Sequence, residues 1–264
     1  MTRIAPDAMF GPDTVSASVI SESVLLLGGP RALLLQLAHP KVAAGVDDYS
    51  DFEADPFGRL RRTLDAMETI SFGTRDEAAG VLARLGRVHD AVAGELPGGE
   101  AYAANDPALL FWVHATLVDT VLEVERRYLG RLDGDERAAF YDESRRLAAA
   151  FGVPDDLVPP DLPAFEAWMD ELFHSLEVSD VARRLSRSIL WPRIPLVPRP
   201  FWEPLRMVTV DMLPRPIREG YGLAWDGRRK RVVRSSQAVV RAVLPRLPDL
   251  VRNFPHHARR ALAG

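Results

Sequence analysis

Apolar residues recur at helical spacing along most of this chain, and that periodicity limits the fold more than any other feature. The spacing of three to four residues runs from Ser18 to about Leu190, as in helices that bury one face. No Asn-Gly or Asp-Gly pair lies between alternating apolar runs, so the usual signal of a β-hairpin is missing. We therefore predict an all-α fold.

The clearest helix is predicted between Thr74 and Gly94. Thr74 and Glu77 have the spacing of a capping box, in which each side chain bonds the other residue's backbone. One face of this helix is apolar: Ala78, Val81, Leu82, Leu85, Val88 and Val92. A second clear start is Asp106-Pro107, a cap acceptor followed by a proline at the first helical position.

Other boundaries follow from similar signals. Pro40 predicts a break at His39. Helices are expected over residues 18–27, 31–38, 56–70, 74–94, 107–128, 135–151, 163–176, 179–190 and 227–244.

We expect a single domain that covers residues 1–264 and has two special segments near its end. Residues 191–204 contain five prolines, which predicts an extended segment that wraps the body of the protein. Residues 226–264 are expected to form a helix and a basic tail.

Composition narrows the class of protein. The formal net charge of −4 argues against a nucleic-acid or membrane-surface protein, because both partners select clustered positive charge. With no cysteine, any metal must be held by histidine or carboxylate. The first ten residues lack an apolar run, and the most apolar stretch, residues 24–38, is too short to span a membrane. We expect a cytoplasmic protein without stable membrane insertion.

Two histidines are predicted to face the interior. His89 follows Leu85 by four residues on the apolar face of its helix, and His114 lies between Leu110 and Leu117 on the next helix. A buried imidazole needs a partner, which iron or a backbone carbonyl can provide. Both interpretations stay open for each residue.

A third helix carries an arginine and a threonine on one face. Arg59 and Thr63 are four residues apart, at the margin of an apolar surface that includes Leu64 and Met67. The guanidinium suits a carboxylate or propionate, and the hydroxyl could donate to bound dioxygen. The simpler interpretation pairs Arg59 with a nearby carboxylate and bonds Thr63 to its own helix. The chain lacks the common nucleophile, phosphate-loop, dinucleotide and zinc-protease motifs.

Five segments, found in this order, carry a resemblance to a known family. They are LLLGGPRALLLQLAHPKVAAGV, DPFGRLRRTLDAMETISFGT, RVHDAVAG, YAANDPALLFWVHATLVDT and FGVP. Together they resemble the catalytic domain of the latex-clearing proteins, or rubber oxygenases, and the mpaB-type oxygenases. The resemblance covers roughly residues 25–181.

The resemblance implies an all-α domain that binds haem b and uses O₂ to oxidise a hydrophobic, unsaturated or isoprenoid substrate. Its axial histidine falls on His89, and its Arg-x-x-x-Thr pair falls on Arg59 and Thr63. His114 and His39 match family positions of less certain role.

The chain departs from the family at one place. Many relatives have a His-Ser pair where this chain has Tyr49-Ser50, which puts substrate or oxygen handling in doubt. Two alternatives remain open: a haem or lipophile binding protein without turnover, and a non-haem metal enzyme that uses His39, His89 and His114.

Overall fold

Helices make up nearly all of the regular structure, which confirms the all-α prediction. The computed structural model describes residues 4–49, 56–192 and 197–253, with the backbone alone for 56–61 and 249–250. The α-helices are α1 (Val15–Ile20), α2 (Gly29–Ala38), α3 (Pro40–Tyr49), α4 (Pro56–Phe72), α5 (Arg75–Asp90), α6 (Pro107–Val124), α7 (Gly134–Ala150), α8 (Leu162–Ser175), α9 (Asp180–Leu190), α10 (Glu203–Met212), α11 (Arg215–Gly220), α12 (Gly227–Val243) and α13 (Asp249–Arg252).

Shorter elements connect these helices. They are the 3₁₀ turns η1 (Ser23–Gly28), η3 (Asp155–Leu157), η4 (Arg199–Trp202) and η5 (Leu244–Arg246), the π-helical turn η2 (Glu125–Leu129), and the strands β1 (Ala93–Glu95) and β2 (Ala101–Ala103). The strands pair antiparallel, with Gly94 opposite Tyr102.

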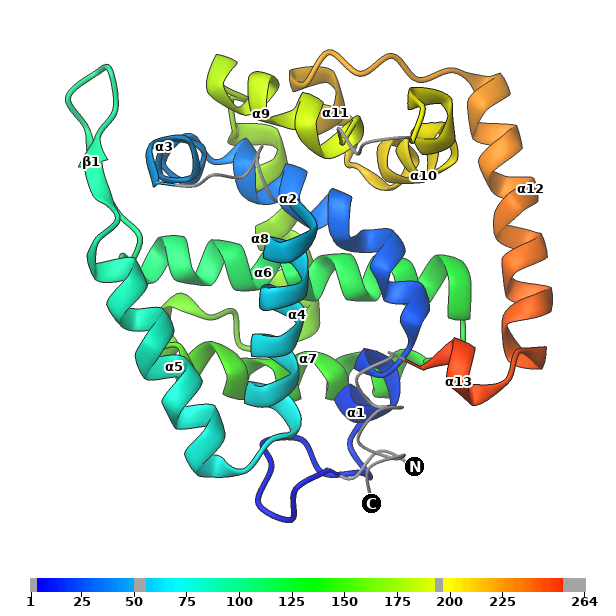
Figure 1. Ribbon diagram of the computed structural model, residues 1–264, viewed down its shortest axis with the longest axis horizontal. Coiled ribbons are helices and arrows are strands. Elements are labelled where there is room, and N and C mark those ends of the chain that lie inside the picture. Colours follow the sequence, from blue (N-terminus) through cyan, green and yellow to red (C-terminus); the bar gives the residue numbers. More distant parts are fainter. Residues whose placement is uncertain (1–3, 50–55, 193–196, 254–264) are drawn as a thin grey trace.

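Helix α6 runs through the middle of the molecule (Figure 1). It packs against α2, α7 and η1, and many of its side chains are buried, among them Phe111, Trp112 and Ala115. The stretch Pro107–Leu129 is long and apolar enough to cross a membrane, but most of it is buried inside the fold. This burial is typical of the core helix of a globular fold.

The cap signals in the sequence mark real helix ends. Thr74 and Glu77 form the predicted capping box at the start of α5, and Asp106 accepts from the Ala108 N–H at the start of α6. His39 ends α2 in an extended conformation, as Pro40 requires.

Three predictions about elements were wrong. The region 18–27 is divided between α1 and η1 instead of forming one helix, the segment after α5 forms a β-hairpin, and residues 203–220 contain α10 and α11. Pro204 lies in the first turn of α10, where proline is tolerated, so the prolines up to that residue do not all belong to an extended segment.

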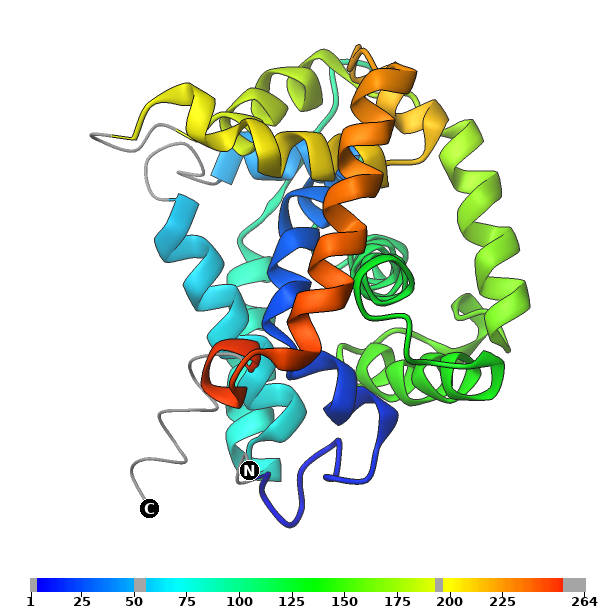
Figure 2. The same ribbon diagram turned by 90° about the vertical axis from the view of Figure 1, so that its right-hand side faces the viewer.

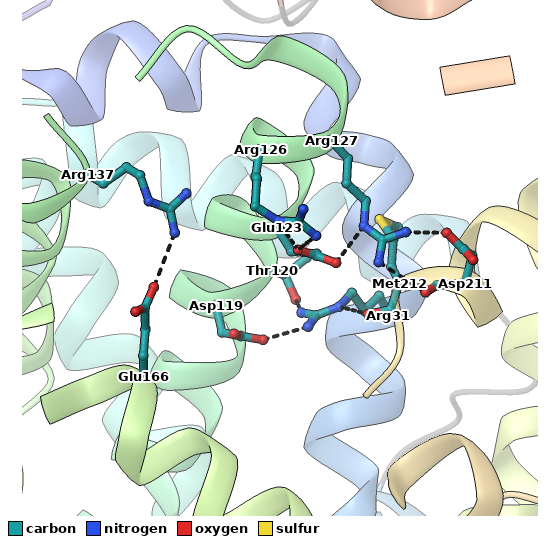
Figure 3. A network of polar contacts seen from close by, with 10 residues as sticks. All are labelled: Arg31, Asp119, Thr120, Glu123, Arg126, Arg127, Arg137, Glu166, Asp211 and Met212. Atoms are coloured by element: carbon teal, nitrogen blue, oxygen red, sulfur yellow. Dashed lines mark hydrogen bonds and ion pairs between the residues drawn. The ribbon is translucent and has the colours of Figure 1, made fainter. Parts of the chain in front are cut away.

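A buried arginine joins three helices beside α6 (Figure 3). Arg31 on α2 is only 3% exposed. Its guanidinium donates to Asp119 Oδ2 at 2.7 Å, Thr120 Oγ1 at 2.6 Å and the Met212 carbonyl at 2.9 Å. Because one rigid guanidinium meets all three acceptors, it fixes α2, α6 and α10 relative to one another.

A second arginine also connects helices through ion pairs. Arg127, in η2, pairs with Glu123 on α6 and with the buried carboxylate of Asp211 on α10. These groups lie close to the Arg31 group (Figure 3).

A buried carboxylate ties the two ends of the described chain together. Glu22 is 1% exposed and pairs with Arg131 at 2.8 Å and with Arg252 at 3.0 Å. Residue Asn253 forms a β-bridge with Glu22. The fold is therefore closed by residues 230 positions apart in sequence.

Helix α12 lies on the outside of the molecule. It contacts η2 and α10 through one face, and its other face fronts the view in Figure 2, where none of the described elements crosses it. At the contact with η2, Gly130 has φ 61°, and a Cβ there would meet Arg241 Nη2 at 1.7 Å. Glycine is therefore needed for both the turn and the approach of α12.

Candidate functional site

His89 lies at the last turn of α5, where the helix meets the hairpin. Its side chain is half-buried, and it does not lie in the enclosed core that the helical pattern predicted. The neighbouring Val88, also expected on the buried face, is 57% exposed. Helix α5 packs mainly against α4 through Val81 and the half-buried Leu82 and Leu85, so this last turn reaches the edge of the packed surface.

Asn105 holds this last turn and the histidine ring. Its side-chain amide donates to the Gly86 carbonyl and to Asp90 Oδ1. A hydrogen bond between Asn105 and His89 partly offsets the effect of burial, which lowers the pKa of His89 below 6.5. His89 is therefore neutral near pH 7. One ring nitrogen bonds Asn105, and the ring has no other hydrogen-bond partner among the residues that the structure describes.

Helix α3 supports the hairpin just after His89. Tyr49, which replaces the histidine of many family members, donates its hydroxyl to the Ala93 carbonyl at 2.7 Å. Tyr102 donates to Asp48, and burial, followed by this carboxylate, raises the pKa of Tyr102 to about 12. The departure at Tyr49 thus gives this chain a contact between α3 and the residues that follow His89.

The threonine predicted as a site residue lies on α4. Thr63 is exposed, whereas Leu64 and Met67 are half-buried, so Thr63 is at the margin of the apolar face as expected. Arg59 falls in the first turns of α4, and its side chain lies outside the described residues. Helices α4 and α5 are side by side in both views (Figures 1 and 2).

His114 lies in the core, as predicted, and has a partner there. It is 6% exposed and hydrogen-bonds the backbone of Ser144 on α7. Burial lowers the pKa of His114 to about 4. This geometry matches the simpler of the two interpretations, a packing histidine bonded to the backbone.

His39 has a half-buried ring between α2 and α3. Its centroid is 6.3 Å from the ring of Trp112. Burial and the nearby Lys41 lower the pKa of His39. Its Nδ1 is buried without a hydrogen-bond partner among the residues that the structure describes.

The three histidines do not form a metal site. Within the described ranges, no group of three histidine or carboxylate side chains could hold a metal ion. This finding removes the support for a non-haem metal enzyme that uses His39, His89 and His114 together.

Neither of the two best-defined cavities borders His89. An open cavity of about 460 Å³ lies where the start of α9 meets Gly220, lined also by Val178 and Arg183. A cavity of about 10 Å³ lies between Pro30 and Trp202. Among the residues described, the site at His89 is a surface edge at the end of α5.

Sequence reasoning missed two groups that matter here. Asn105, which holds His89, precedes the cap residue Asp106, and no local pattern connects it to a histidine 16 positions earlier. Arg31 did leave a signal, because it is a single charge in the apolar run GGPRALLLQL, where an unpaired cation is costly.

Comparisons with known proteins agree with the resemblance found in the sequence. Residues 18–242 match the family described as ER-bound oxygenase mpaB/B′/Rubber oxygenase, catalytic domain. The chain is 26% identical over 236 residues to Uncharacterized protein Rv2237 of Mycobacterium tuberculosis and, equally, to Uncharacterized protein Mb2261 of Mycobacterium bovis, covering 86% of this chain and 88% of each relative. No solved structure matches. The family match spans most of the chain, and this protein therefore belongs to the mpaB and rubber oxygenase catalytic-domain family.

Proposed function

We propose that this protein is a haem b-dependent oxygenase in which His89 is the axial ligand. The observation that carries the proposal is the state of this imidazole: neutral, half-buried and bonded to Asn105 through one nitrogen. A haem-ligating histidine requires a free lone pair and benefits from a partner that fixes its ring. Membership in an oxygenase family supplies the reaction class.

The residues present fit this cofactor at the point of ligation. His89 would hold the iron, and Asn105 would fix the orientation of the ring and its tautomer. When bound, haem supplies the oxygen chemistry, and the protein sets ligation, polarity and access. Arg59 and Thr63 would orient dioxygen or anchor a propionate, a role that the resemblance suggests and the exposure of Thr63 allows.

The substrate is proposed to be hydrophobic and unsaturated, such as an isoprenoid. Val88, beside His89, exposes 57% of its surface, and the hydroxyl of the half-exposed Tyr49 bonds Ala93, four residues past His89. The exposed valine beside His89 would favour contact with a hydrocarbon chain.

The direct test is the absorption spectrum of the protein after haem is supplied. Wild type should show a Soret band that shifts on dithionite reduction, and His89→Gly should lose it. Added imidazole should restore the band in His89→Gly, because the free base can occupy the vacated position. His174→Gly, at an exposed position on α8, is the matched control and should behave as wild type.

Two results would separate the proposal from its rivals. Unchanged haem binding by His89→Gly would overturn the assignment of the axial ligand. Haem binding without oxygen uptake by the reduced protein, when it is offered polyisoprene or terpenoids, would favour a binding protein without turnover.

A further inference from the structure

The exposed face of α12 has an apolar stripe that the proposed oxygenase site does not use. Val232, Val239 and Val243 are 50%, 62% and 46% exposed. Their spacing of seven and four residues places them within about 40° of one another around the helix. The adjoining side of α12, about 80–100° around the helix from Val232, is used by the fold, where Val233 is buried and Val240 packs against the core.

Basic residues flank this stripe. Between Gly227 and Pro248 the chain has seven Lys or Arg residues and no acidic one, although its formal net charge is −4. Arg228 and Arg231 lie about 40° and 100° to one side of Val232, and Arg229 lies about 60° to the other. At the start of α12 the valine stripe is therefore flanked by cations on both sides.

We propose that α12 docks this protein on an anionic lipid bilayer. An amphipathic helix with an apolar stripe and four to eight cations lies in the membrane interface, with its apolar side in the headgroup region and its cations on anionic lipid. The cations that would meet such a surface are concentrated at the start of α12, between Arg228 and Arg234.

The same surface is a poor match for the other classes of partner. A second copy docked face to face would bring two positive stripes together. Nucleic acid would meet the arginines but would leave the three central valines without a role. A folded protein partner would be expected to find aromatic anchors, and residues 227–248 have none. The whole-chain charge, which argued against a membrane surface, hides this local clustering.

The test is cosedimentation of the full chain with vesicles of phosphatidylcholine alone or with about 30 mol% phosphatidylglycerol. Wild type should bind only the anionic vesicles and should lose binding as salt is raised. Arg228→Glu combined with Arg231→Glu should weaken binding at least about tenfold. Val239→Ser should weaken it less, because it removes apolar area and leaves the charge unchanged.

Matched controls distinguish an effect of α12 from a general effect of surface charge or surface apolar area. Arg187→Glu on α9 and Leu157→Ser in η3 are exposed positions away from α12 and should bind as wild type. Circular dichroism and the haem spectrum should be the same for all variants. The proposal is overturned if wild type ignores anionic vesicles, if the α12 variants bind as wild type, or if duplex DNA displaces the vesicles and Val239→Ser has no effect.

Discussion

The middle of α6 and the last turn of α5 each present a histidine, yet the two regions treat it differently. His114 is enclosed and its ring bonds the Ser144 backbone. His89 is half-buried, and Asn105 occupies one of its nitrogens. In the α6 region, buried polar groups such as Arg31 are paired within the fold. A core position thus encloses its histidine and bonds it to the fold, whereas an edge position leaves the ring partly open to solvent.

The largest expected effect tests the pairing in the core. Arg31→Ala removes the donor to Thr120, Asp119 and the Met212 carbonyl and should lower the free energy of unfolding by about 4 kcal/mol, because it leaves buried acceptors unpaired. Urea denaturation measures the loss. Arg137→Ala, which breaks a pair with the exposed Glu166, should cost about 1 kcal/mol or less. Equal losses would contradict the view that the α6 region depends on buried pairing.

The next effect uses pH to compare the two histidines. Because burial holds the pKa of His114 at about 4 against 6.5 in the unfolded chain, the unfolded chain binds more protons between these values. The contribution of His114 to the free energy of unfolding is therefore complete above pH 6.5. It falls by about 3 kcal/mol as the pH approaches 4. His114→Gln should reduce this loss in urea titrations across the range, and His174→Gln should not. A wild-type slope in His114→Gln would show that another group carries the pH dependence.

At the edge, a smaller effect is expected from the tyrosine that replaces the family histidine. Tyr49→Phe removes the hydrogen bond to the Ala93 carbonyl and should cost about 0.5–1 kcal/mol of stability. Tyr102→Phe, which removes a buried bond to the Asp48 carboxylate, should cost about 2 kcal/mol. Thermal unfolding compares the two variants. A larger loss of stability in Tyr49→Phe than in Tyr102→Phe would contradict this ranking. It would mean that the exposed hydrogen bond of Tyr49 stabilises the hairpin more than the buried one of Tyr102.

The smallest effect concerns His89 itself. Asn105→Ala removes the hydrogen bond that raises the pKa of His89, so that pKa should fall further below 6.5 while global stability changes little. An NMR titration follows both His89 and His39, whose pKa should stay unchanged and serves as an internal control. A rise in the pKa of His89 would mean that Asn105 does not support the ring.

Local chemistry explains which parts of the fold could be predicted from the sequence. Helix starts such as Thr74 and Asp106 are determined by a cap residue and its neighbours within one turn. The hairpin has no such signal, because its strands, Ala93–Glu95 and Ala101–Ala103, hold few residues that favour strands. Tyr102 instead packs beside Gly45 and bonds Asp48, contacts that only the folded chain brings together.

The candidate site could also be predicted only in part from the sequence. The helical periodicity correctly predicted that His114 faces the core. It could not show that the end of α5 extends beyond the residues it packs against, where Val88 is exposed. The same limit applies to Asn105, whose role depends on how the loop before α6 returns to α5. The roles of Arg59, Thr63 and His39, the haem and the cytoplasmic location stay predictions.

The buried carboxylate of Glu22 has a practical consequence for anyone who shortens this protein. The family match ends at residue 242, and a chain cut there would lack Arg252, one of the two cations that neutralise Glu22. The remaining carboxylate would keep Arg131 alone in a site that is 1% exposed. A useful boundary for expression therefore lies beyond Asn253, even though the recognisable homology stops earlier.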